Sequence, residues 1–146
     1  MSNQDPSSQY FNVSPTCVFG YVETAALLPH EALERERLEE LRDWIREDGL
    51  LYHPVIADRE SLVILDGHHR VHILGEVGCH LIPVYLVDYS DPSIRVFSRR
   101  PGIRVTKQQV IERGLAQTPF PPRTSRHVFY PPLRPQPTCL GKLRNP

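Results

Sequence analysis

Apolar and polar residues alternate along the chain in patterns that predict both helices and strands. The clearest helical pattern runs over residues 33–47, where apolar residues recur at helical spacing against a charged face and Gly49 supplies a stop. A shorter helix is predicted over residues 71–77, with Gly78 at its end. Short apolar runs predict strands over residues 17–22, 54–57, 62–65 and 81–87.

The predicted order of these elements is strand, helix, strand, strand, helix, strand. The runs 54–57 and 62–65 are separated only by polar residues, which is typical of a tight β-hairpin. We therefore expect an α+β fold, with a small mixed β-sheet flanked by helices, in a single domain over residues 16–130.

The two ends of the chain have a different character. Residues 1–15 are polar, and we expect them to form a flexible arm. Thr106 and Gln109 stand at the spacing of a capping box and predict a helix that ends at Gly114. Most of the 15 prolines follow Asp91, and residues 131–146 are expected to form an extended, proline-rich segment.

Composition narrows the classes of partner. The 17 Lys and Arg residues balance the 17 Asp and Glu residues, so no overall positive field favours nucleic acid, and we do not expect it as a partner. The stretch after residue 95 is basic and residues 31–48 are acidic, which leaves room for a small anionic ligand.

Cysteine usage and the N-terminus bear on location. Cys17, Cys79 and Cys139 are widely spaced and form no CxxC pair, which indicates reduced thiols. No segment approaches the ~20 apolar residues that span a bilayer, and the N-terminus shows no signal-peptide pattern. We expect a cytoplasmic protein that does not bind membranes.

The passage from Asp66 to Arg70 carries the strongest functional pattern. A strand that turns at Gly67 directly into a helix presents free backbone N–H groups and the positive end of the helix dipole, which favours an anion. The rings of His68 and His69 and the guanidinium of Arg70 can donate further hydrogen bonds to phosphate oxygens. The alternative is an ordinary turn with a solvated arginine.

Asp66 has two interpretations. A carboxylate beside a phosphate site can hold Mg²⁺, and Asp is also a preferred helix N-cap. His68 and His72 stand four residues apart and raise a zinc alternative, although no third ligand follows at a diagnostic spacing.

Two further segments carry candidate chemistry. Glu31 precedes the first predicted helix and could act as a base toward a hydroxyl group, or it could be a solvated residue that favours the helix dipole. The segment 123–127, Arg-Thr-Ser-Arg-His, could grip a carboxylate or a phosphate, or it could be a solvated loop.

Residues 64–70, Ile-Leu-Asp-Gly-His-His-Arg, resemble the phosphate motif of proteins with the ParB/sulfiredoxin fold. Residues 28–31, Leu-Pro-His-Glu, and the segments 105–115 and 120–127 are similar to the free-serine kinase branch, whose members convert L-serine to O-phospho-L-serine with ADP or ATP. Three motifs in the right order are more specific than one, and the resemblance covers residues 17–133.

The resemblance implies a role for each segment. Glu31 would be the catalytic base, and Asp66 would act near Mg²⁺ or the transferring phosphoryl group. The nucleotide phosphates would be bound by Gly67, His68, His69 and Arg70. The amino acid or its new phosphate would be held by Thr124, Ser125, Arg126 and His127. The family has more residues between the phosphate motif and the final Arg-His segment, so a homodimer that completes the pocket stays open.

Other functions of the same fold remain as alternatives. A ParB-like nucleotide-binding module would regulate a partner without turning over a small molecule. A sulfiredoxin-like reductase requires a cysteine in the phosphate motif, where this chain has histidine, and a nuclease requires a carboxylate cluster for two metals. The donor nucleotide, whether ADP, ATP or CTP, is not marked in the sequence.

Overall fold

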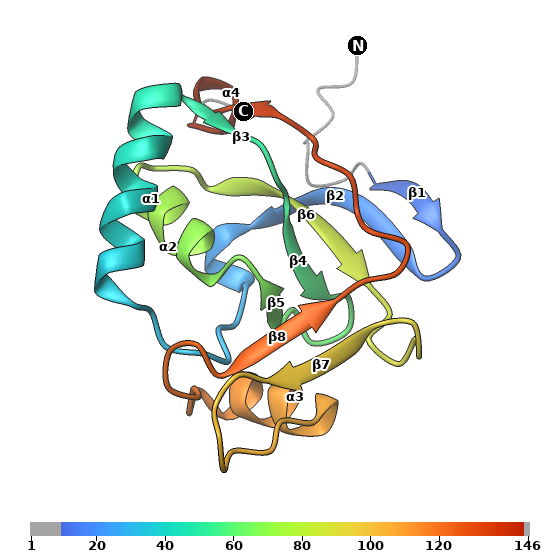
Figure 1. The fold of residues 1–146 in the computed structure, drawn as a ribbon. Helices are drawn as coiled ribbons and strands as arrows, with labels where there is room; N and C mark the ends of the chain where they lie inside the picture. Colours follow the sequence, from blue (N-terminus) through green and yellow to red (C-terminus); the bar gives the residue numbers. More distant parts are fainter. Residues whose placement is uncertain (1–9, 145–146) are drawn as a thin grey trace.

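The computed structural model describes residues 10–144 and is built around a five-stranded mixed sheet (Figure 1). Two short two-stranded sheets and four α-helices surround it. In chain order the elements are β1 (Tyr10–Ser14), β2 (Cys17–Glu23), η2 (Thr24–Ala26), α1 (Arg35–Asp48), β3 (Leu50–Leu51), β4 (Val55–Asp58), β5 (Ile64–Asp66), α2 (His68–Glu76), β6 (Leu81–Val87), β7 (Arg95–Ser98), α3 (Lys107–Ala116), β8 (Ser125–Val128), β9 (Thr138–Cys139) and α4 (Leu140–Arg144).

The strand order in the main sheet is β1-β2-β6-β4-β5. β6 lies at the centre, antiparallel to β2 and parallel to β4, with Val55 of β4 opposite Val84 of β6. β4 and β5 form the predicted hairpin. Because β5 is the edge strand and ends at Asp66, the chain enters α2 at an open margin of the sheet.

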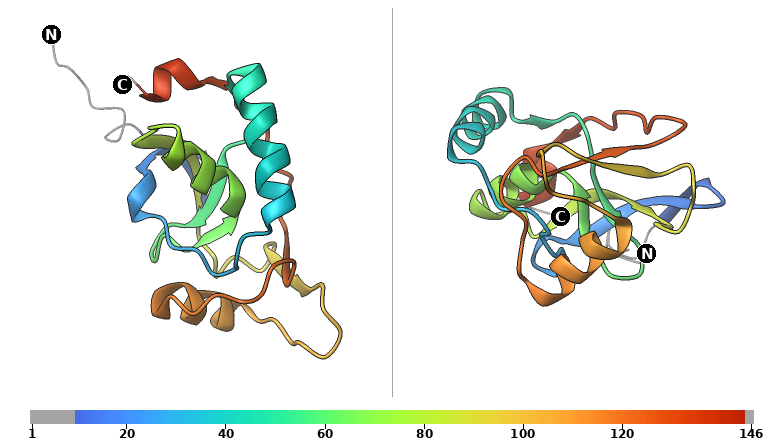
Figure 2. Two further views of the ribbon diagram at one scale, coloured as in Figure 1. Left: turned by 90° about the vertical axis from the view of Figure 1, so that its left-hand side faces the viewer. Right: turned by 60° about the horizontal axis from the view of Figure 1, so that its bottom comes forward.

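Alternate residues of the central strands face two separate cores. Val55, Ala57 and Val84 face a core that also contains buried residues of α1, α2 and α4. Ile56 and Tyr85 face a second core with residues of α3 and the loops beside it. Successive residues of a strand point to opposite faces of the sheet, and here both faces are buried. Figure 2 shows α3 at the opposite end of the molecule from α4.

The expected α+β fold with a mixed sheet and flanking helices is confirmed. The helix predicted over residues 33–47 is α1, and Gly49 ends it in the left-handed conformation with φ 65°. The predicted capping box is also present, because the Thr106 side chain accepts the Gln109 N–H and the Gln109 side chain accepts the Thr106 N–H. Within residues 10–144, none of the helices combines the length and apolarity needed to cross a membrane.

The end of α3 differs from the prediction. The helix continues past Gly114 to Ala116, and Gln117 ends it in the left-handed conformation. Gly114 instead allows close packing, since a Cβ atom there would lie 2.5 Å from Cγ2 of Val63. This glycine serves helix–sheet contact rather than helix termination.

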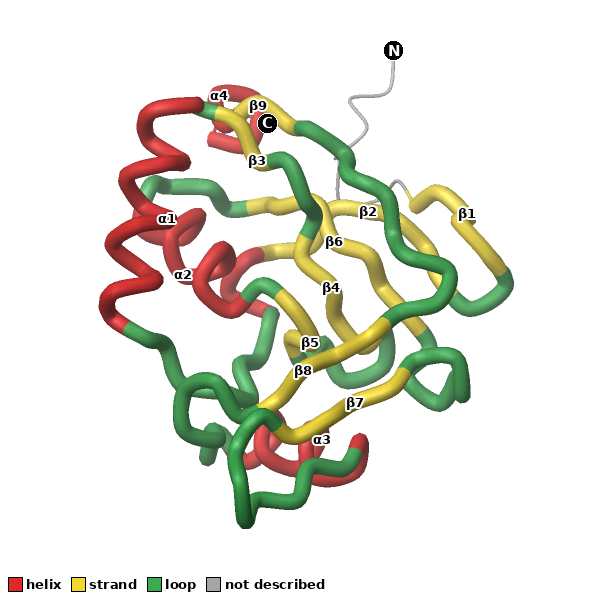
Figure 3. The backbone as a smooth tube through the Cα atoms, viewed as in Figure 1, coloured by secondary structure: helices red, strands yellow, loops and turns green. Residues whose placement is uncertain are grey.

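The proline-rich C-terminal segment is not wholly extended, so that prediction was wrong. β9 pairs with β3, with Cys139 opposite Leu50, and α4 follows directly (Figure 3). Leu140 and Leu143 of α4 are buried in the core shared with α1 and α2. No proline lies between Pro137 and Pro146, and the two leucines at helical spacing in this interval are stabilised more by burial than by exposure to solvent.

The N-terminal arm also needs correction where the structure describes it. Residues 10–14 form β1, an edge strand whose residues are all exposed, so burial imposed no alternating pattern that the sequence could reveal. The rest of the expected arm, residues 1–9, lies outside the described residues. The ribbon of β7 and β8 was missed for a similar reason, since most of its residues are half-buried or exposed.

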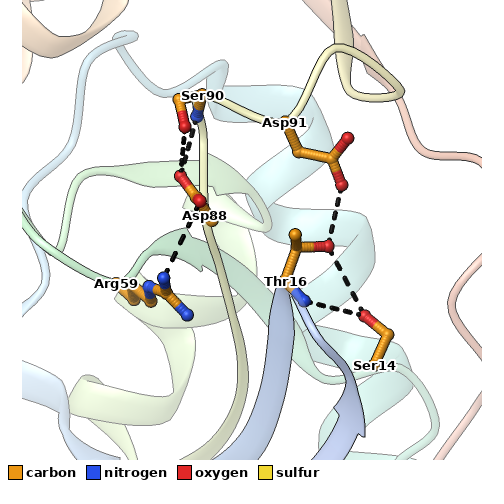
Figure 4. A network of polar contacts seen from close by, with 6 residues as sticks. All are labelled: Ser14, Thr16, Arg59, Asp88, Ser90 and Asp91. Carbon is orange, nitrogen blue, oxygen red and sulfur yellow. Dashed lines mark hydrogen bonds and ion pairs between the residues drawn. The ribbon is translucent and has the colours of Figure 1, made fainter.

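A polar network fixes the loop that follows β6 (Figure 4). Thr16, in the turn between β1 and β2, donates its hydroxyl to Asp91 at 2.7 Å, and Ser90 donates its hydroxyl and its N–H to Asp88. Lys107 donates to the backbone oxygens of Tyr89 and Asp91. The network fixes the backbone of Tyr89, whose hydroxyl lies 2.7 Å from Nε2 of His127 in β8.

Candidate active site

A cleft of about 1010 Å³ opens between α1, the start of α2 and β8 with the loop that follows it. Glu31, residues 66–70 and residues 125–127 all line this cleft, together with Arg123. The fold therefore brings together the three segments that the sequence singled out, although nearly a hundred residues separate the first from the last.

Gly67 shapes one wall of the cleft. It is the N-cap of α2 with φ 106°, a conformation that residues with a side chain rarely adopt. A Cβ atom there would lie 2.9 Å from Nη2 of Arg70 and 3.1 Å from Cγ2 of Val55. The first N–H groups of α2 have no partner within the helix, so this junction presents donors and a positive dipole end to the cleft.

Asp66 does not cap α2, because Gly67 holds that position and no side chain caps the helix. Its Oδ2 accepts a hydrogen bond from Nη2 of Arg70 at 3.2 Å, and the carboxylate is otherwise well exposed. Arg70 also donates to the backbone oxygen of His53 at 3.0 Å. The guanidinium is thereby held beside the start of α2.

The rings of His68 and His69 have a different role from the one expected. Nε2 of His68 accepts the backbone N–H of His30 at 3.1 Å, and Nε2 of His69 accepts that of Glu34 at 2.9 Å. Burial lowers the pKa of both rings, which favours the neutral form that can accept these bonds. The two histidines join the phosphate motif to the loop that carries Glu31, and they add no positive charge.

Glu31 is anchored by the backbone and side chain at the start of β8. Its Oε1 accepts three hydrogen bonds, from the N–H of Thr124 at 3.0 Å and from the N–H and hydroxyl of Ser125 at 2.7 and 2.9 Å. A parallel bridge between Glu31 and Phe120 fixes the backbone. Glu31 is thus a half-buried, oriented carboxylate rather than a solvated one.

His30 is a residue of the site that sequence reasoning passed over. It is fully buried, its Nδ1 donates to the backbone oxygen of Ile64 at 2.6 Å, and its Nε2 lies 2.8 Å from the Ser125 hydroxyl. Because burial lowers its pKa, the ring is neutral and Nε2 is an acceptor. The Ser125 hydroxyl proton can therefore point to His30 or to Glu31. The available signal was a histidine directly beside the candidate base.

Only some residues of the segment 123–127 have side chains that are free to contact a ligand in the cleft. Thr124 is fully buried and does not line the cleft; its hydroxyl donates to the oxygen of Pro121 at 2.6 Å. Arg123 forms an ion pair with Glu34. Arg126 lines the cleft with an exposed side chain, and His127 lines it with a half-buried ring.

His127 completes a group of three close imidazoles. Its Nε2 lies 2.7 Å from the Tyr89 hydroxyl, and its Nδ1 is buried without a partner among residues 10–144. The ring centroids of His30 lie 4.6 Å from those of His68 and 5.8 Å from those of His127. Burial and the neighbouring His30 lower the pKa of His127 to about 3.

Acid should destabilise the protein through these histidines. The unfolded chain takes up protons on His30, His68 and His127 below pH ~6.5, whereas burial lowers the pKa of these three rings in the folded chain, so the free energy of unfolding falls as pH decreases from there toward 3. His127 alone contributes about 2 kcal/mol of loss between pH 6.5 and 5. Urea unfolding at pH 7, 6 and 5 measures this slope.

Two variants separate this cause from the titration of carboxylates. His127→Gln should reduce the difference between pH 7 and pH 5, whereas His80→Gln, which removes an exposed histidine, should keep it. An equal slope in wild type and His127→Gln would show that the buried ring does not control the profile.

The zinc alternative is not supported by the geometry. The His68 ring is committed to His30, and the His72 ring lies 3.0 Å from Glu76 on the exposed side of α2. Across residues 10–144, no group of three or more His, Cys, Asp or Glu side chains is arranged to hold a metal ion. Asp66 remains a single exposed carboxylate beside the start of α2, which suits an ion that also binds phosphate oxygens.

No family model matches the chain. Among curated proteins it is 28% identical over 95 residues to an ATP-dependent L-serine kinase of Staphylothermus marinus, a match that spans 62% of this chain and 38% of the relative. It is 26% identical over 97 residues to an ADP-dependent L-serine kinase of Thermococcus kodakarensis, across 64% of this chain and 40% of the relative.

A ParB-like protein of Sulfolobus acidocaldarius is 34% identical over 76 residues, across 52% of this chain and 38% of the relative. The matches thus span about two fifths of the length of these curated relatives.

Solved structures share the fold. Free serine kinase in complex with AMP superposes with a TM-score of 0.76 at 16% identity, covering 86% of this chain and 93% of that one. A mutant of the same kinase in complex with ADP gives the same TM-score at 15% identity, with the same coverage. The resemblance to free serine kinases and ParB-like proteins is therefore confirmed, and the fold is that of free serine kinase.

Proposed function

We propose that this protein is a phosphotransferase that moves a phosphoryl group from ADP or ATP to the hydroxyl of free L-serine, giving O-phospho-L-serine. One observation carries the proposal: an oriented carboxylate, Glu31, lines the same cleft as the glycine-led N-terminus of α2. The serine kinases among its relatives support the choice of reaction.

The nucleotide phosphates lie at the start of α2. Backbone N–H groups of residues 67–70 and the Arg70 guanidinium donate to phosphate oxygens, and Gly67 lets the phosphate approach the backbone closely. Because the neighbouring histidines are neutral, the positive end of the helix dipole and Arg70 provide the favourable electrostatics. Mg²⁺ would be held by Asp66 and phosphate oxygens, where it would neutralise charge on the transferring group.

Glu31 removes the proton from the serine hydroxyl. The hydroxyl oxygen forms a bond to the terminal phosphorus of the donor, and the bond from that phosphorus to the bridging oxygen breaks. Its electron pair leaves with AMP when ADP is the donor, or with ADP when ATP is the donor. The hydrogen bonds from Ser125 and Thr124 all reach Oε1, which fixes the carboxylate for this role.

The serine is held by the start of β8. Arg126 is the exposed guanidinium of that segment and suits the serine carboxylate. His127 also lines the cleft, and we assign its ring to a polar group of the substrate or to its phosphate. Thr124 and Ser125 act on Glu31 rather than on the substrate. We also propose that the protein is cytoplasmic, where free L-serine and the donor nucleotide are found.

The test is direct formation of product. The protein is mixed with L-serine, Mg²⁺ and either ADP or ATP, and O-phospho-L-serine is measured by mass spectrometry, together with AMP or ADP. We expect phosphoserine in equal amount to the nucleotide product. Tight nucleotide binding with no phosphoserine would favour the second candidate, a ParB-like regulatory module without turnover, to which the ParB-like relative points.

A further inference from the structure

Two aromatic side chains stand exposed beside the cleft. Trp44 on α1 is 55% exposed and Tyr52, between β3 and β4, is 41% exposed. Their ring centroids lie 6.5 Å apart with planes inclined by 32°. Two large aromatic side chains that are exposed next to each other form an apolar patch on the surface, and such patches often mark binding sites. A planar ligand could stack on these rings.

These rings border a small apolar pocket of about 60 Å³ that adjoins the cleft. Leu41, Trp44, His53 and Arg70 line both the pocket and the cleft. Arg70 also contacts Asp66 and the backbone of His53. The apolar pocket is therefore continuous with the proposed phosphate site and does not form a separate surface.

The spacing along α1 matches an extended nucleotide. His69, next to the proposed phosphate site, accepts the N–H of Glu34 at the start of the helix. Trp44 lies ten residues further on, which is about 15 Å along a helix axis. That span is comparable to the distance between the base and the terminal phosphate of a nucleoside diphosphate.

We propose that Trp44 and Tyr52 form the nucleobase site of the donor nucleotide, a proposal that rests on the function proposed above. The base lies over the apolar pocket and stacks on Trp44. Most residues of the pocket are aliphatic or aromatic, and the Arg70 guanidinium is assigned to the phosphates. Because the pocket wall is largely apolar, we assign selectivity to stacking: ADP and GDP should bind about equally and more tightly than CDP and UDP.

The single tryptophan of the sequence reports on this site directly. Titration with ADP should change the fluorescence of Trp44, whereas pyrophosphate, which lacks a base, should bind in calorimetry with little effect on fluorescence. Trp44→Ala should weaken ADP binding by about tenfold or more and leave pyrophosphate binding unchanged, and Trp44→Phe should retain most of the affinity.

Phe11→Ala is the matched control, because it removes an aromatic ring of similar exposure from β1. It should bind ADP like wild type. The base site is wrong if Trp44→Ala binds ADP as tightly as wild type, or if CDP binds as tightly as ADP, even when phosphoserine is formed. If neither ADP nor pyrophosphate binds, the proposed kinase function fails together with the base site.

Discussion

Glu31→Gln is expected to lower kcat for phosphoserine formation by about 10²- to 10⁴-fold, the usual contribution of a general base. Glutamine keeps the size of the side chain, and its amide oxygen can still accept the N–H groups of Thr124 and Ser125. The fold and the affinity for ADP should therefore stay close to wild type. Initial rates measured by phosphoserine production, with calorimetry for ADP, separate the two quantities.

Glu39→Gln is the control for this experiment. It makes the same change of charge on α1, at an exposed residue that pairs with Arg35 and does not line the cleft. Its kcat should equal that of wild type. Full turnover by Glu31→Gln would remove Glu31 as the base and leave the nucleotide site unaffected.

Gly67→Ala is expected to damage nucleotide binding more than any other small substitution. Alanine at φ 106° costs about 1–3 kcal/mol in backbone strain. Its Cβ must also displace the Arg70 guanidinium, which lies 2.9 Å away, and it would occupy the space where a phosphate approaches the backbone. We expect affinity for ADP, measured by calorimetry, to fall by more than tenfold.

Gly78→Ala is the control for Gly67→Ala, because it introduces similar backbone strain outside the nucleotide site. Gly78 also has a positive φ, 87°, but a Cβ atom there meets nothing within 4 Å and lies outside the cleft. This variant should lose a comparable amount of stability in urea and still bind ADP like wild type. Equal losses of ADP affinity in both variants would show that the effect of Gly67 is one of general stability.

Local signals predicted most of the fold. The hairpin of β4 and β5, the left-handed Gly49 and the capping box at Thr106 each depend on residues close in sequence. The return of Leu140 and Leu143 to the core depends on pairing between β3 and β9, which are far apart in the chain. No local pattern encodes such a contact, and the prolines before it favoured the wrong prediction.

In the candidate site too, local sequence predicts some features, and contacts between distant segments determine the others. The conformation of Gly67 follows from a strand that runs directly into a helix, and its place in the cleft could be predicted from the motif. The roles of the histidine rings could not, because they depend on how the loop before α1 approaches α2. Thr124 was assigned to the substrate, although its position places it behind Glu31.

A crystal structure of Glu31→Gln with ADP and L-serine would locate both substrates. We expect phosphate oxygens within hydrogen-bonding distance of the backbone N–H groups at 67–70, and the serine hydroxyl between residue 31 and the terminal phosphorus. Phosphates bound elsewhere, with the start of α2 occupied by protein side chains, would contradict this expectation.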